Sequence, residues 1–194
     1  MKPQTTRLVA YTLAVIAAGI VALFYVTRVS HVHEAARPAA LAKLQPDKSP
    51  AVVPAVAFVD ASGGVHQLSD YRGRYLLLNL WATWCAPCVK ELPALSGLKQ
   101  AMGDRKFAVV AVDVGRDPAN EAAKFLNAHH ADALIVYRDT NSAFLHAFGA
   151  YGLPLTVLID PQGREVARAV GAVSWNDKSA IAWFRDLANR SKRI

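Results

Sequence analysis

Apolar and polar positions follow one another along residues 54–190 in a pattern that predicts alternating strands and helices. Residues 75–81 and 107–114 are almost uninterrupted apolar runs, which is typical of strands buried on both faces of a parallel sheet. Between them, residues 86–102 predict a helix, because apolar side chains recur at helical spacing at Val89, Leu92, Leu95 and Leu98. A strand, a helix and a second parallel strand therefore open the predicted domain.

The next segments continue the alternation of helix and strand. Asp117 is predicted as the N-cap of a helix whose first residue is Pro118. A strand over residues 133–137 and a short helix over residues 142–148 follow. This order favours parallel crossover connections.

The pattern changes after Gly152, where two apolar runs lie close together in the sequence. Residues 155–159 and 165–170 are joined by Asp160-Pro161-Gln162-Gly163, which suits a type I turn and predicts an antiparallel hairpin. A second hairpin is expected nearer the N-terminus, where residues 56–59 and 65–68 flank a Gly-rich loop. A last helix is expected to bury Ile181, Phe184 and Leu187 on one face.

The N-terminal region has a different composition. Residues 8–27 contain no charged side chain, and about 20 apolar residues are needed for a helix to span a bilayer. A cleaved signal peptide is the alternative, but its apolar region is normally shorter and no small-residue cleavage site follows closely. We therefore expect an uncleaved membrane anchor over residues 1–29, a flexible linker over residues 30–53 and a domain over residues 54–194.

Composition narrows the classes of function. The chain has 194 residues, of which 53% are hydrophobic, and this suits one catalytic domain with extra segments. Its two cysteines are too few for a disulfide framework, and no metal site is expected. The net charge of +7 comes from scattered basic residues, so we expect no nucleic-acid binding; a basic surface near anionic lipids or acidic partners is the simpler interpretation.

The two cysteines carry the clearest chemistry. Cys85 and Cys88 stand two residues apart, directly after the predicted strand at 75–81 and at the start of the predicted helix. Unpaired N–H groups and the positive end of the helix dipole favour a thiolate there. Cys85 is thus the expected nucleophile, and Cys88, one turn inside the helix, the expected resolving thiol of a redox-active disulfide.

Several motifs together resemble the TlpA-like and ResA-like membrane-anchored thioredoxins. They are the stretch from Asn79 to Cys88, Glu91-Leu92-Pro93, Gly152-Leu153-Pro154 and Ile159-Asp160-Pro161-Gln162-Gly163. The resemblance covers about residues 54–190 and implies an α/β thioredoxin fold, in which helices flank a central mixed sheet. It also implies an N-terminal β-hairpin and an inserted strand–helix unit.

The resemblance assigns further site residues. Pro154 is expected to be a cis-proline facing the disulfide, with the backbone of Leu153 open to an extended substrate. Trp84 and Pro87 are expected to support the site, whereas Trp81 is expected to pack in the core. Two departures stand out: Asn79 replaces thioredoxin's buried Asp, and Arg116 stands where a ResA-type Glu is expected after the strand at 107–114. These departures favour the TlpA-like branch.

The resulting expectation is a thiol:disulfide oxidoreductase in the cytoplasmic membrane, inserted through residues 8–29, with its domain in the periplasm. It would act mainly as a reductase of client-protein disulfides in cytochrome oxidase or cytochrome c biogenesis. It would take electrons from a membrane donor and need no cofactor besides its own disulfide. Two alternatives stay open: a disulfide-forming oxidase or isomerase, and a non-catalytic copper-delivery module with Cys85 and Cys88 as ligands.

Overall fold

A mixed β-sheet of eight strands runs through the part of the chain that the computed structural model describes, namely Gly19 and residues 36–190. The strand order is β1-β8-β7-β4-β5-β6-β2-β3. The strands are β1 (Gln45–Val52), β2 (Ala57–Asp60), β3 (Val65–Gln67), β4 (Tyr75–Trp81), β5 (Phe107–Asp113), β6 (Tyr137–Arg138), β7 (Leu155–Ile159) and β8 (Arg164–Val170). The helices are η1 (Ala39–Leu41), η2 (Leu68–Tyr71), α2 (Ala86–Met102), α3 (Ala119–Ala128), α4 (Ala143–Ala147) and α5 (Lys178–Arg190).

β4 lies near the middle of the sheet and directs side chains to both faces. It pairs in parallel with β5 and antiparallel with β7. Leu77 and Trp81 join the core on the face covered by α2, α3 and α5, whereas Leu76 and Leu78 join the core on the opposite face. This alternation is the period of two that a pleated strand imposes.

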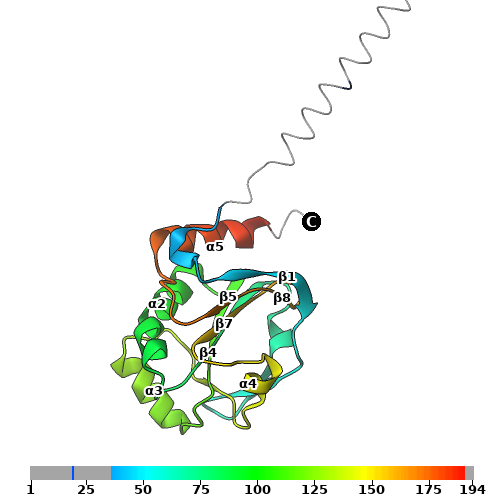
Figure 1. Ribbon diagram of the computed structural model, residues 1–194. Coiled ribbons are helices and arrows are strands. Elements are labelled where there is room, and N and C mark those ends of the chain that lie inside the picture. The colour runs from blue at the N-terminus through cyan, green and yellow to red at the C-terminus, as the bar shows by residue number, and fades with distance from the viewer. Residues whose placement is uncertain (1–18, 20–35, 191–194) are drawn as a thin grey trace, which may run out of the picture. The chain divides into compact units, whose positions relative to one another are not determined.

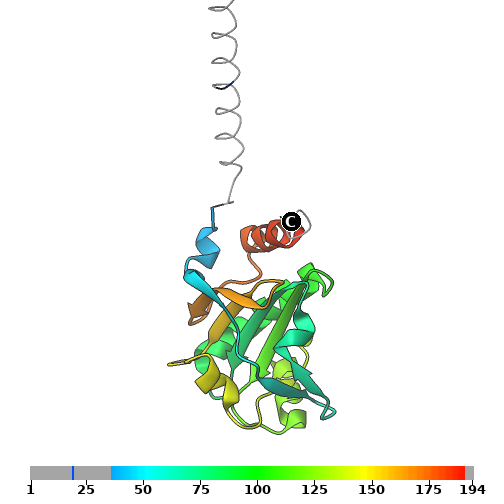
Figure 2. The ribbon, with the colours of Figure 1, turned by 90° about the vertical axis from the view of Figure 1, so that its right-hand side faces the viewer.

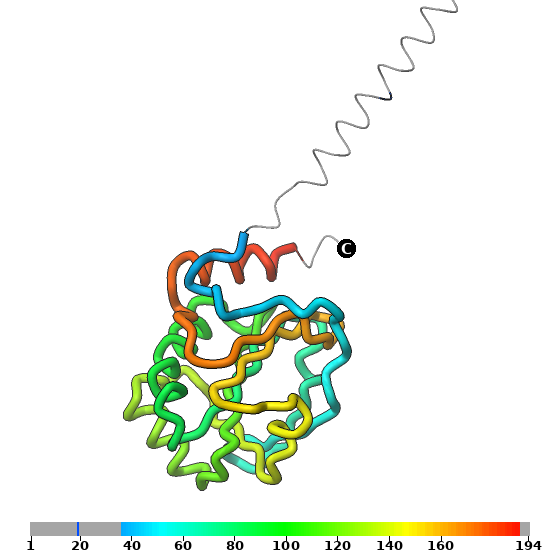
Figure 3. Tube along the Cα trace, in the orientation of Figure 1, coloured from blue at the N-terminus to red at the C-terminus, as the bar shows by residue number. Residues whose placement is uncertain are grey.

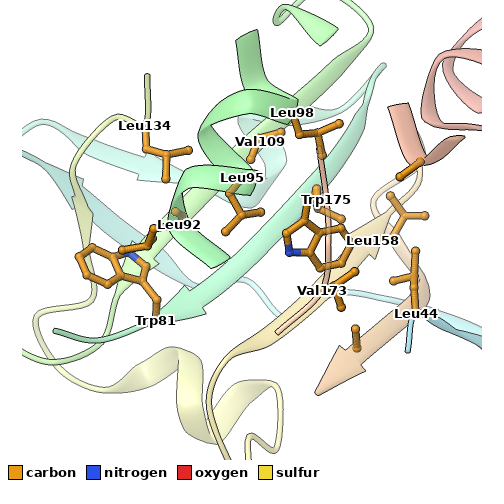
Figure 4. Packing of buried hydrophobic residues seen from close by; sticks show 14 of the residues in the cluster. Leu44, Trp81, Leu92, Leu95, Leu98, Val109, Leu134, Leu158, Val173 and Trp175 are labelled. Carbon is orange, nitrogen blue, oxygen red and sulfur yellow. The ribbon is translucent and has the colours of Figure 1, made fainter. Parts of the chain in front are cut away.

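The larger core lies between the sheet and α2 (Figure 4). Leu92, Leu95 and Leu98 of α2 are fully buried there, as their helical spacing predicts. Trp175, just before α5, packs beside them and is also fully buried. The core therefore fixes the helix that begins at the two cysteines.

Most predicted elements are present. The helix after the cysteines, the two apolar strands and both antiparallel hairpins are confirmed. The strand expected over residues 133–137 is wrong, because only Tyr137–Arg138 form β6. Residues 131–134 instead make a turn in which the Leu134 N–H bonds the Ala131 carbonyl, and Leu134 is buried in the α2-side core.

The structure differs from the expected linker over residues 30–53. From Arg37 onward the chain belongs to the same compact unit as the sheet. Leu41 and Leu44 are fully buried, and β1 pairs antiparallel with β8 at the sheet edge. Figure 3 shows η1 and β1 running beside α5 and β8, so this segment belongs to the domain.

The expected membrane anchor lies outside the described residues, apart from Gly19. Within the part of the chain that the structure describes, no helix is both long and apolar enough to cross a membrane.

Candidate active site

Cys85 and Cys88 form a disulfide at the junction of β4 and α2, with an S–S distance of 2.03 Å. Cys85 is the N-cap of α2, and its Sγ accepts a hydrogen bond from the Cys88 N–H at 3.3 Å. Cys85 is 5% exposed and Cys88 is completely buried. An N–H donor and the N-terminal end of a helix both stabilise a thiolate at Cys85 in the reduced protein.

Pro87 lies in the first turn of α2. Its missing N–H costs nothing there, because the first N–H groups of a helix have no partner within it. Pro87 therefore fixes the backbone between the cysteines without weakening the helix.

The structure brings the other predicted site residues to the same end of the sheet. The Leu153–Pro154 peptide bond is cis, as expected. Leu155, the next residue, pairs with Leu80 of β4, so Pro154 lies beside the segment that leads to Cys85. Trp84, directly before Cys85, is 70% exposed, whereas Trp81 is buried as expected.

One exposed aromatic residue in this region was not expected from the sequence. Tyr151 precedes the cis-proline by three positions and is fully exposed. A single exposed tyrosine in a loop gives no hydrophobic pattern to detect.

A buried carboxyl group lies one helical turn after Cys88. Glu91 Oε1 accepts from Asn79 Nδ2 at 2.8 Å, and Oε2 accepts from Trp175 Nε1 at 3.0 Å and the Val173 N–H at 3.1 Å. Burial raises the pKa of Glu91 to about 7, although these three hydrogen bonds act in the opposite direction. Glu91 can therefore hold or release a proton near neutral pH.

Glu91 was missed as a functional residue, although its motif was noted. The available signal was an acidic residue three positions after Cys88, next to Leu92, on the face of the helix that is otherwise apolar. The buried carboxylate near Cys88 thus comes from α2 and not from the loop after β5. Arg116, in that loop, donates to the Ser142 hydroxyl at 2.9 Å. The absence of a Glu at position 116 therefore does not decide between the TlpA-like and ResA-like branches.

Two acidic residues lie beside the loop before Cys85. Asp113, which pairs with Trp81 across β4 and β5, is buried, and its Oδ1 accepts from the Gly115 N–H at 2.7 Å. Burial raises its pKa to about 6. Asp117 Oδ2 accepts from the Thr83 hydroxyl at 2.8 Å. Asp117 thereby links the loop after β5 to the active-site loop.

The predicted N-cap role of Asp117 is wrong. Helix α3 begins at Ala119 with Pro118 as its N-cap, and no side chain caps it. The side chain of Asp117 is already engaged by Thr83.

Metal binding was not expected from the sequence. Across Gly19 and residues 36–190, no group of three or more His, Cys, Asp or Glu side chains is arranged to hold a metal ion.

Comparison with known proteins points to one family. The Redoxin family profile matches residues 47–182. The thiol-disulfide oxidoreductase ResA of Geobacillus thermodenitrificans (strain NG80-2) is 35% identical over 118 residues, which cover 61% of this chain and 67% of that protein. ResA of Geobacillus kaustophilus (strain HTA426) is 34% identical over 124 residues, which cover 64% of this chain and 70% of that protein.

The solved structures agree with this fold. A structure from Chlorobium tepidum, described as a thiol:disulfide interchange protein DsbE, matches with a TM-score of 0.61 and 26% identity. The match covers 74% of this chain and 97% of that one. With a disulfide at the start of α2 and a cis-proline directly before β7, the chain belongs to the Redoxin family, among its ResA/TlpA-like thioredoxins, and is a thiol-disulfide oxidoreductase.

Proposed function

We propose that this oxidoreductase is a membrane-anchored reductase of client-protein disulfides in the periplasm. The observation that carries the thiol–disulfide exchange in this proposal is the asymmetry of the two cysteines. Cys85 lies at the helix N-terminus beside the exposed Trp84, whereas Cys88 is completely buried beneath it. A client disulfide can therefore reach Cys85 first, and Cys88 acts afterwards from inside the protein.

The exchange proceeds in two displacement steps. The Cys85 thiolate attacks one sulfur of the client disulfide, a mixed disulfide forms, and the other client sulfur leaves as a thiolate. Cys88, as a thiolate, then attacks the Cys85 sulfur, the Cys85–Cys88 disulfide forms, and the second client sulfur leaves. Two electrons pass from the enzyme to the client, and a membrane dithiol donor must return two electrons to regenerate the enzyme.

The second step requires Cys88 to lose its proton inside the protein. Glu91 lies one turn further along α2, and its pKa of about 7 is close to that needed to accept a proton at neutral pH. Asn79 has no acid–base function, so Glu91 is the proton acceptor that we propose for Cys88. This role suits a reductase, because it makes the resolving thiol reactive.

The proposed location and clients rest on the sequence. The uncharged segment over residues 8–27 and its short N-terminal tail favour an anchor with the domain outside the cytoplasm. The resemblance to TlpA-like and ResA-like proteins suggests clients in cytochrome oxidase or cytochrome c assembly, whose cysteines are reduced before they take copper or haem.

The reduction potential of the Cys85–Cys88 pair tests the proposed direction. The protein would be equilibrated in glutathione buffers and its free thiols trapped at each ratio. A potential near that of thioredoxin, about −270 mV, is the expected result. A potential near about −120 mV would instead assign the enzyme to disulfide formation.

A further inference from the structure

A basic hollow lies at the end of the domain far from the disulfide. It has a volume of about 570 Å³ and is lined by the end of α2, the start of β5 and the last turns of α5. Three of its residues, Arg105, Lys106 and Arg185, are exposed cations. Arg105 and Lys106 directly precede β5, whereas Arg185 lies on α5, so the fold brings together charges from two segments that are far apart in the sequence.

The positive charge of this basic hollow is not cancelled by the acidic residues near it. Asp104 pairs with Lys99 at 3.2 Å, and Asp186 pairs with Arg190. Among the described residues, the three cations of the hollow form no ion pair. Two of them have neutral partners instead: Lys106 Nζ donates to Asn189 Oδ1 at 2.7 Å, and Arg185 donates to the Ala101 carbonyl at 3.1 Å.

The hollow and the disulfide lie at opposite ends of α2. The disulfide is at the start of this helix, which begins at Ala86, and the hollow includes Met102, its last residue. A helix of this length extends about 25 Å. A surface that contacts the hollow therefore leaves Cys85 facing away from it.

The chain also enters the domain at this end. Arg37 lies over the Trp183 ring of α5, at 6.0 Å from its centroid, and η1 packs on the same helix. Figures 1 and 2 show η1 and α5 together at one end, with α3 and α4 towards the other. Because the domain begins at Arg37, only residues 30–36 separate it from the proposed anchor, and a chain of that length reaches at most about 25 Å.

We propose that the basic hollow formed by Arg105, Lys106 and Arg185 docks on the anionic headgroups of the membrane in which the chain is anchored. The inference rests on the anchor proposed above. Docking holds the domain by its entry end and directs the disulfide towards clients in the aqueous phase. The contact is electrostatic, so it weakens as salt screens the charges.

Hydrogen exchange of the full chain in lipid nanodiscs tests this docking. One set of discs contains only phosphatidylcholine, and the other adds 30 mol% phosphatidylglycerol. Amides in residues 102–107 and 183–190 are expected to exchange several-fold more slowly in the anionic discs, and this protection is expected to disappear in about 0.5 M salt.

A pair of matched variants identifies the residues responsible. Each basic side chain near an anionic surface strengthens binding about fivefold, so Arg105→Gln with Arg185→Gln is expected to weaken docking about 30-fold. Lys90→Gln with Lys124→Gln removes the same charge from exposed positions elsewhere and should keep the protection. Arg105→Lys with Arg185→Lys should also keep it, which separates charge from a structural effect of the arginines.

The outcomes also separate docking from anchoring. Equal exchange in both kinds of disc, by a chain that is incorporated in them, overturns docking and leaves the anchor intact. Equal loss of protection in the two glutamine pairs overturns the assignment to the hollow. A chain that does not enter either disc contradicts the anchor, and the docking proposal falls with it.

Discussion

Trp81 and Trp84 are only three residues apart in the sequence, but one packs in the core and the other lies at the surface beside the active site. Trp81 is 1% exposed and lies in the α2-side core, whereas Trp84 is 70% exposed beside Cys85. Exposed side chains contribute little to stability, so Trp84→Ala should change the free energy of unfolding by less than about 0.5 kcal/mol. Trp81→Ala should cost about 3–5 kcal/mol, because it leaves a large cavity.

The effect of Trp84→Ala on the rate of client reduction tests whether Trp84 has a function. If Trp84 contacts clients, Trp84→Ala should reduce a protein disulfide about tenfold more slowly and leave reduction of a small disulfide unchanged. Urea unfolding and both reductase assays would be run on the same samples. Equal loss with both substrates would assign Trp84 to the chemistry of the cysteines instead of client contact.

Substituting each cysteine alone should separate the roles of the two thiols. With Cys88→Ser the mixed disulfide cannot be resolved, so Cys85 should retain a client covalently. Cys85→Ser removes the more accessible thiol and should trap nothing. Non-reducing electrophoresis and mass spectrometry of the adduct would measure this, and trapping through Cys88 in the Cys85→Ser protein would reverse the assignment.

Among the individual site residues, the sequence predicts those that belong to a short motif. The positions of Cys85, Cys88 and Pro154 follow from local patterns and the family resemblance. The role of Glu91 depends instead on burial and on donors from Asn79 and Trp175, which are distant in sequence. Sequence spacing does not show which side chains the fold brings around a carboxylate.

Among the elements, η1 and β1 lie in a segment for which the hydrophobic pattern predicted only a linker. β1 is an edge strand that is exposed along almost its whole length and contains Pro46 and Pro50. Edge strands tolerate proline and need no alternation of apolar residues, so their sequences resemble linkers. The only cues were Leu41 and Leu44, whose burial depends on α5 and the sheet.

Truncation tests whether this segment stabilises the domain. A chain that begins at Lys48 lacks Leu41 and Leu44, and burial of a leucine side chain contributes about 2 kcal/mol. We expect it to unfold at least about 4 kcal/mol more easily in urea than a chain that begins at Arg37. Equal unfolding midpoints would show that residues 37–47 form no more than a linker.

For the whole molecule, the strongly patterned central strands were predictable, whereas β1 and β6 were not. β4 and β5 are buried on both faces, and their apolar runs identify them without any knowledge of neighbours. β6 is only two residues long, because the preceding residues turn to bury Leu134 against α2. Where the run of apolar residues was short, tertiary packing therefore determined whether a strand formed.

The stability of the oxidised protein should fall as the pH rises from about 4 to 7. The ordinary pKa of a glutamate side chain is 4.5, and that of Glu91 in the folded protein is about 7, so the folded state holds this proton more tightly than the unfolded chain does. Asp113, raised from 3.8 to about 6, acts in the same direction over a lower range. For Glu91 the loss amounts to about 3 kcal/mol, complete above pH 7.

Glu91→Gln should remove the part of this pH dependence above about pH 6, and reduce it at lower pH, without disrupting the buried network. A glutamine oxygen can still accept from Trp175 and the Val173 N–H. Its amide can donate to Asn79 Oδ1, which has no partner in the described structure, if the Asn79 amide turns over. Asp113→Asn is the matched control, because it should flatten only the lower range. Urea unfolding at intervals from pH 4 to 8 measures all three proteins, and parallel curves for wild type and Glu91→Gln would show that Glu91 does not titrate as its burial requires.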